Sequence, residues 1–173
     1  MKKCVFAVFL AALAPFSSAA DAEAKFGEWF SSVNDRGIAY AATMNDSGGA
    51  LMNACDPADG LCTWYVLMQT SCEQNSTYVS LVNSSQGSSA HNLTCEGALT
   101  VGGKQLYRYI ISDPDTMDKV GAMVGMVGFA VPLDSGQFRV LRFSLSGSTA
   151  AVSHMRKLAE ASPKNTKTKD LVL

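Results

Sequence analysis

Few side chains in this sequence have the type and spacing that chemistry requires. The two histidines, His91 and His154, fall in a predicted strand and in the last predicted helix. The chain has no Gly-x-Ser-x-Gly, P-loop or His-Glu-x-x-His motif, so the main hydrolase signatures are missing. An isolated histidine in such an element more often packs or faces solvent than acts as a general base. We therefore expect a non-enzymatic protein with no catalytic residue.

Three aspartates, Asp113, Asp115 and Asp118, lie close enough in sequence to suggest a calcium cluster. Their position at the start of a predicted helix gives a simpler explanation. Asp113 would cap the helix, Pro114 would occupy its first position, and acidic residues in the first turn would interact favourably with the helix dipole. The sequence therefore favours a helix start over a metal site.

The methionines Met117, Met123 and Met126 form the kind of thioether group that can hold Cu(I). They lie among valines and a phenylalanine, and methionine is a good filler of irregular core space. We expect core residues and no cofactor. Residues 120–133 are nonetheless the most apolar stretch after residue 20, and two alternatives stay open: a core segment or an exposed contact face.

The first twenty residues have the pattern of a bacterial-type export signal. Lys2 and Lys3 form a positive start, residues 5–13 are an unbroken apolar run, and residues 18–20 are small, as a signal peptidase requires. The apolar run is far shorter than the roughly 20 residues that span a bilayer. We predict cleavage after Ala20.

The predicted cleavage sets the domain organisation and the location. Cys4 precedes the apolar run instead of following the cleavage point, so we expect no lipid anchor. Residues 21–161 have the length of one domain with a proper core. Residues 162–173 are a polar stretch that we expect to be a flexible tail. The expected location is periplasmic or secreted.

Four cysteines remain after the signal: Cys55, Cys62, Cys72 and Cys95. An even number of cysteines in an exported chain predicts two disulfides, with three possible pairings. Zinc sites normally show two close Cys-x-x-Cys pairs, which this spacing lacks. We therefore expect no metal site.

The local sequence favours the pairing of Cys55 with Cys62 and of Cys72 with Cys95. Residues 56–61 contain a proline and a glycine where a hairpin turn needs them, and they join two apolar stretches. Chain-entropy arguments give about 2.5 kcal/mol for the short loop and about 3.4 kcal/mol for the long one. The longer bridge should therefore stabilise the fold more.

Short strands separated by polar turns dominate the rest of the chain. A second helix is predicted over residues 148–161, where Met155 and Leu158 lie on one apolar stripe and should both be buried. The pattern indicates a mainly β (α+β) fold: an antiparallel sandwich or barrel-like sheet, one short helix to about Met123, and a C-terminal helix packed on the sheet. The predicted strands are residues 26–33, 38–44, 50–54, 63–68, 78–83, 91–95, 106–111, 128–133 and 137–145.

Two short segments resemble a known family. Phe26-Gly27-Glu28-Trp29 is similar to the Phe-Gly-Asp-Trp opening of the invasion-associated locus B family. Residues 142–151, Arg-Phe-Ser-Leu-Ser-Gly-Ser-Thr-Ala-Ala, look like that family's closing strand, glycine and final helix. The family commonly has a cysteine just after its tryptophan strand, where this chain has Ser31, Ser32 and Val33. The resemblance implies a periplasmic β-sandwich with a C-terminal helix and a non-enzymatic accessory role.

Charge limits the choice of partner. Without Lys2 and Lys3 the chain has 12 basic and 15 acidic residues. Residues 21–155 hold 7 basic against 13 acidic residues, and the remainder holds 5 against 2. An acidic body argues against nucleic acid. We expect a partner among the proteins of the cell envelope and no stable membrane anchor.

Two other functions stay open at this stage. An inhibitor or small-ligand-binding module would use an exposed loop such as residues 84–90. An unrecognised periplasmic enzyme would need a polar site assembled only in space.

Overall fold

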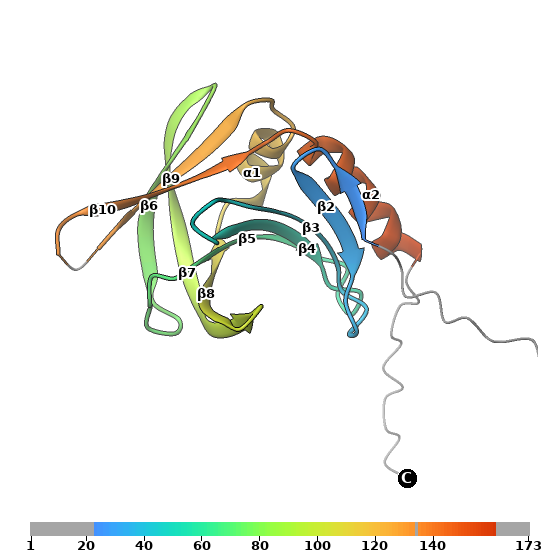
Figure 1. The fold of residues 1–173 in the computed structure, drawn as a ribbon, viewed down its shortest axis with the longest axis horizontal. Coiled ribbons are helices and arrows are strands. Elements are labelled where there is room, and N and C mark those ends of the chain that lie inside the picture. The colour runs from blue at the N-terminus through green and yellow to red at the C-terminus, as the bar shows by residue number, and fades with distance from the viewer. Residues whose placement is uncertain (1–22, 134, 162–173) are drawn as a thin grey trace, which may run out of the picture.

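Ten strands and two helices make up the part of the chain that this computed structural model describes, residues 23–133 and 135–161. The predicted signal (1–20) and tail (162–173) lie outside the described residues. The predicted mainly β fold, with one short and one C-terminal helix, is confirmed (Figure 1). The strands are β1 (Ala24–Phe26), β2 (Trp29–Val33), β3 (Ala39–Met44), β4 (Ala50–Cys55), β5 (Cys62–Met68), β6 (Thr77–Ser84), β7 (Gly87–Val101), β8 (Lys104–Ile111), β9 (Met126–Pro132) and β10 (Phe138–Ser144), and the helices are α1 (Pro114–Gly121) and α2 (Ser148–Ala161).

All ten strands belong to one antiparallel sheet in the order β1-β2-β3-β4-β5-β8-β7-β6-β9-β10. The sheet is open, and it bends so that its two halves face different directions, with α2 running beside β2 (Figure 1). β10 is the last strand at one end of the order, and β1 is the last at the other. Such end strands have backbone groups on one side that no neighbouring strand pairs.

The first predicted strand is two strands. Gly27 has a φ of +60°, and together with Glu28 it turns the chain so that Phe26 pairs with Trp29. The prediction of one strand over 26–33 was wrong because its aromatic residues suit either a continuous strand or a hairpin. Glycine reaches this left-handed conformation at little cost, which explains why the chain can turn here.

The strand predicted over 91–95 is much longer. β7 extends over fifteen residues and passes through a bulge between Cys95 and Gly97. Its sequence, with two serines and one asparagine in the first half, lacks a sustained alternating apolar pattern that would mark a strand, because much of its length is exposed. The bulge is possible because Gly97 has a φ of +113°.

The hydrophobic core lies between the inner face of the bent sheet and the two helices. Trp29 and Trp64 meet edge to face at its centre, with ring centroids 6.2 Å apart. Met155 of α2 is fully buried, as predicted, and its sulfur lies 3.2 Å from Cys55 Sγ. Leu158 is only partly buried against this core, less than predicted.

Both favoured disulfides are present. Cys55 is bonded to Cys62 across the β4–β5 hairpin, and Cys72 is bonded to Cys95 in β7. Cys95 is fully buried, so the second bridge ties the loop before β6 to the core. Disulfides are typical of proteins that work in oxidising compartments.

The disulfides predict the thiol chemistry of the chain from residue 21 onward. The native protein should show no reactive thiol towards Ellman's reagent, and denaturation with a reductant should expose all four cysteines. Two or more reactive thiols in the unreduced protein would contradict the pairing.

Candidate functional site

The outer side of β6, β9 and β10 carries apolar side chains that the fold does not cover. Along β9 the side chains alternate: Val127, Phe129 and Val131 point inward and are buried, whereas Met126 and Ala130 point outward. β6 and β10 alternate in the same way. The inward side chains of β6, β9 and β10 pack in the core, whereas the outward side chains take no part in the core.

The strand register brings the outward residues together. Leu81 of β6 pairs with Ala130 of β9, which in turn pairs with Val140 of β10. These three side chains therefore form one row across three strands. With Val124 and Met126 they line a shallow groove of about 650 Å³.

Exposed apolar side chains are concentrated on this part of the molecule. Of nine large hydrophobic residues described as exposed, six lie here, with exposed fractions of 50–83%. A contiguous apolar patch of this kind commonly marks an interaction surface. We call this set the outer apolar face; its members are Val79, Leu81, Val124, Met126, Phe138 and Val140.

The strands β6, β9 and β10 carry a different charge from the rest of the chain. β6 and β9 contain no charged residue, and β10 contains only Arg139 and Arg142. Arg142 lies on the outer side beside the groove. An apolar surface bordered by arginine and lacking acidic residues suits a partner that is apolar and acidic.

Residues 120–133 include both buried core side chains and exposed apolar side chains. Met117 is buried in the core, as expected, but Met126 is about half exposed on the outer apolar face. The expectation that all three methionines are core residues was wrong for Met126. A sequence stretch that is apolar throughout does not reveal which alternate side chains face solvent.

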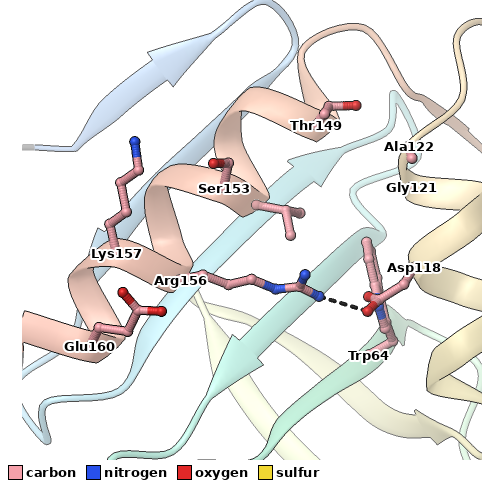
Figure 2. Close-up of a pocket in the computed structure, with 10 residues that line it drawn as sticks. Trp64, Asp118, Gly121, Ala122, Thr149, Ser153, Arg156, Lys157 and Glu160 are labelled. Atoms are coloured by element: carbon pink, nitrogen blue, oxygen red, sulfur yellow. Dashed lines mark hydrogen bonds and ion pairs between the residues drawn. The ribbon is translucent and has the colours of Figure 1, made fainter.

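A second depression, of about 390 Å³, lies between α1 and α2. Arg156 extends from α2 towards Asp118 of α1, close to Trp64 (Figure 2). Trp64 Nε1 donates to Asp118 Oδ1 at 2.7 Å, and Arg156 Nη2 lies 2.7 Å from Asp118 Oδ2. The Asp118 carboxylate connects both helices to the sheet. Its contacts therefore have a structural role in holding α1 and α2 in place.

Two of the three aspartates considered as a calcium cluster, Asp113 and Asp118, have separate structural contacts, and Asp115 lies in the first turn of α1. Asp113 caps α1 by accepting a hydrogen bond from the Thr116 amide at 3.0 Å, and this contact lowers the pKa of the Asp113 carboxyl. Asp118 holds Trp64 and Arg156 as described above. Among the described residues, no group of three or more histidine, cysteine or acidic side chains is placed to hold a metal ion.

Each histidine has a serine partner, which the sequence pattern did not suggest. Ser31 Oγ lies 2.7 Å from His154 Nδ1, and Ser89 Oγ lies 2.7 Å from His91 Nε2. Ser31 is fully buried, so its hydroxyl cannot reach a substrate. His91 is also buried, and Asp113 nearby is engaged in capping α1. Ser89, in contrast, is exposed, so packing accounts for the contact between Ser31 and His154 but not for the contact between Ser89 and His91.

The loop proposed for an inhibitor is short. β6 ends at Ser84 and β7 begins at Gly87, so most of residues 84–90 belong to strands or to a tight turn. Residues 85–90 are exposed, as expected, but they form a tight turn and the first residues of β7 instead of a separate loop.

A polar groove of about 830 Å³ lies on the inner side of β10. Arg139 Nη1 donates to Thr70 Oγ1 at 3.4 Å, and the Tyr109 hydroxyl donates to the Thr70 carbonyl at 3.0 Å. Burial raises the pKa of Tyr109 to about 12. Arg139 therefore has one long hydrogen bond to a neutral partner among the described residues and no ion pair among them.

The two sequence segments that suggested a family lie against each other in the fold. The Glu28 amide donates to the Ser146 carbonyl at 3.0 Å, and Trp29 Nε1 donates to the Ser144 carbonyl at 2.7 Å. Gly147 faces the carbonyl oxygen of Phe26 so closely that no side chain fits between them. The two segments form one joint, in which the end of β10 and the start of α2 meet the β1–β2 hairpin.

The fold has a counterpart among solved structures. The chain is similar to the crystal structure of invasion associated protein B from Bartonella henselae, with a TM-score of 0.57 over 80% of this chain and 99% of that one. The two proteins share a fold. Their sequences are 13% identical, so the likeness extends to the fold alone. No protein-family model matches the chain, and no curated protein matches its sequence.

Proposed function

We propose that this protein is an exported, non-enzymatic accessory protein that acts by binding another protein of the cell envelope through the outer apolar face. The observation that carries the proposal is the concentration of exposed apolar side chains on β6, β9 and β10. Leu81, Val140 and Met126 line one groove there, and Arg142 borders it. Burying such side chains against a partner is worth about 25 cal/mol per Å² of apolar area.

Export is supported by the sequence of the first twenty residues and by the two disulfides. No helix among the described residues is long and apolar enough to cross a membrane. The fold shared with invasion associated protein B from Bartonella henselae supports the family resemblance of residues 26–29 and 142–151, which implies an accessory role. We place the protein in the periplasm or outside the cell.

The non-enzymatic role is supported by the contacts of the side chains that could act in catalysis. His91 and His154 each pack in the fold beside a serine. Asp118 is engaged by Trp64 and Arg156. His154 and Asp118 therefore have structural contacts that account for them.

The proposal predicts that substitutions in the outer apolar face reduce the capture of a partner protein. The chain from residue 21 onward, immobilised and incubated with periplasmic extract of the source organism, should capture a protein. Leu81→Ser combined with Val140→Ser should reduce that capture at least about tenfold, because two apolar side chains at the centre of the face are lost. Quantitative mass spectrometry of the captured proteins measures the effect.

A matched control removes two exposed apolar side chains elsewhere. Met44→Ser combined with Leu61→Ser changes residues that are equally exposed and lie outside the outer apolar face. This control should capture as much partner as the unaltered protein. Equal capture by both double variants, each shown to be folded by circular dichroism, would rule out the outer apolar face as the binding surface.

A further inference from the structure

The register of β10 identifies which of its backbone groups point away from the sheet. The Leu145 amide donates to the Gly125 carbonyl at 2.8 Å, so Leu145 faces β9. The Ser144 carbonyl accepts from Trp29 Nε1, which approaches from the opposite side. Backbone groups alternate in direction along a strand, so Phe138, Val140 and Arg142 point the same way as Ser144.

The edge of β10 is therefore unpaired from Phe138 to Arg142 within the described residues, since β9 is its only neighbour in the sheet. The side chains of the same outward-pointing residues are exposed on the outer side of the sheet. Phe138 and Val140 belong to the outer apolar face. Natural proteins usually protect such an edge, because it is a template for another strand.

We propose that the partner adds an extended segment to β10 as an eleventh strand of the sheet. This inference rests on the proposed function and specifies the class of partner that the outer apolar face binds. Main-chain hydrogen bonds to Phe138, Val140 and Arg142 would supply affinity, and side chains at alternate positions would supply specificity. The added strand would also extend the outer apolar face by one strand.

The charges on β10 determine the chemistry of that segment. Arg142 projects on the outer side and Arg139 on the inner side, and neither is in an ion pair among the described residues. A matching strand has an acidic residue opposite each arginine and apolar residues opposite Phe138 and Val140. Read antiparallel to β10, a sequence such as Glu-Val-Val-Glu-Val meets these requirements.

Two other occupants fit less well. A second copy paired through β10 would bring four arginines together from the two strands and no acidic residue. The C-terminal residues 162–173 contain three lysines and one aspartate, so their charge has the same sign as that of the edge. Charge complementarity therefore favours an acidic segment from a different protein.

The test uses the chain from residue 21 onward and a fluorescent peptide with the core Glu-Val-Val-Glu-Val, with binding followed by fluorescence anisotropy. A peptide with both glutamates replaced by lysine serves as the control. The acidic peptide should bind at least about tenfold more tightly, and added salt should reduce the difference. Equal binding of the two peptides would contradict the assigned charge pattern.

A substitution in the edge separates strand addition from side-chain contact. Val140→Pro removes an amide that points away from β9, and proline is tolerated where the amide faces solvent on an edge strand. Val140→Ala keeps the amide and removes most of the same side chain. Val140→Pro should weaken the acidic peptide about tenfold more than Val140→Ala does, because a main-chain hydrogen bond and the extended edge geometry are lost.

The outcomes distinguish this inference from the proposed function. If Val140→Pro and Val140→Ala bind the peptide equally, while Leu81→Ser with Val140→Ser still loses the captured partner, strand addition is wrong and the face is a side-chain contact only. If neither measurement changes with any variant, both proposals fail. A dimer detected by sedimentation velocity and abolished by Val140→Pro would identify a second copy as the occupant and overturn the acidic partner.

Discussion

Gly147→Ala should destabilise the protein by more than about 4 kcal/mol, enough to unfold a typical domain at least in part. A β-carbon at this position would overlap the carbonyl oxygen of Phe26, and Gly147 also has a φ of +93°. The overlap involves backbone on both sides, so no flexible side chain can move to relieve it. The joint between the β1–β2 hairpin and the start of α2 would have to open. Thermal and urea denaturation measure the loss.

Gly125→Ala is the matched control for that change. Gly125 has a φ of +97°, nearly the same as Gly147, but a β-carbon there would meet nothing within 4 Å. This variant should therefore lose only the cost of the backbone conformation, about 1–2 kcal/mol. Equal losses for the two variants would show that Gly147 is required for its φ and that the close approach to Phe26 contributes nothing.

Met155→Ala should lower the free energy of unfolding by about 2–5 kcal/mol. The Met155 side chain is fully buried between α2 and the sheet and contacts the sulfur of Cys55. Its truncation removes the transfer energy of the buried atoms and leaves a cavity beside the Cys55–Cys62 disulfide. Urea denaturation monitored by circular dichroism gives the value.

Two other substitutions in α2 serve as comparisons for the stability loss of Met155→Ala. Leu158→Ala should cost less than Met155→Ala, because Leu158 is only partly buried. Lys157→Ala should change stability by no more than about 0.5 kcal/mol, because Lys157 is exposed on the side of the depression between the helices. A loss at Lys157 as large as that at Met155 would show that α2 is oriented differently.

The sequence predicted the elements whose local signals agree with the fold. α2 begins and ends at the predicted residues, and Asp113 caps α1 as expected. The Cys55–Cys62 hairpin follows from its turn residues. The Gly27 turn and the full length of β7 were not predictable in this way. Whether residues 26–33 form one strand or two depends on contacts with residues 144–147, which are remote in sequence.

The candidate site could be predicted only in part. The apolar stretch 120–133 contains two exposed members of the outer apolar face, Val124 and Met126. The rest of the outer apolar face comes from β6 and β10, and only the sheet order places those strands on either side of β9. The role of Gly147 could not be predicted from the local sequence either, because Phe26, whose carbonyl oxygen it faces, is more than a hundred residues away.

Site-specific photo-crosslinking in living cells tests the central claim most directly. A photoreactive amino acid replaces Val140 in one strain and Leu61 in another, because both residues are more than half exposed and only Val140 lies on the outer apolar face. Irradiation should give a discrete crosslinked product with one envelope protein from position 140 and none of that product from position 61. The same product from both positions, or none from position 140 in a folded protein, would contradict the assignment of this face as the partner-binding surface.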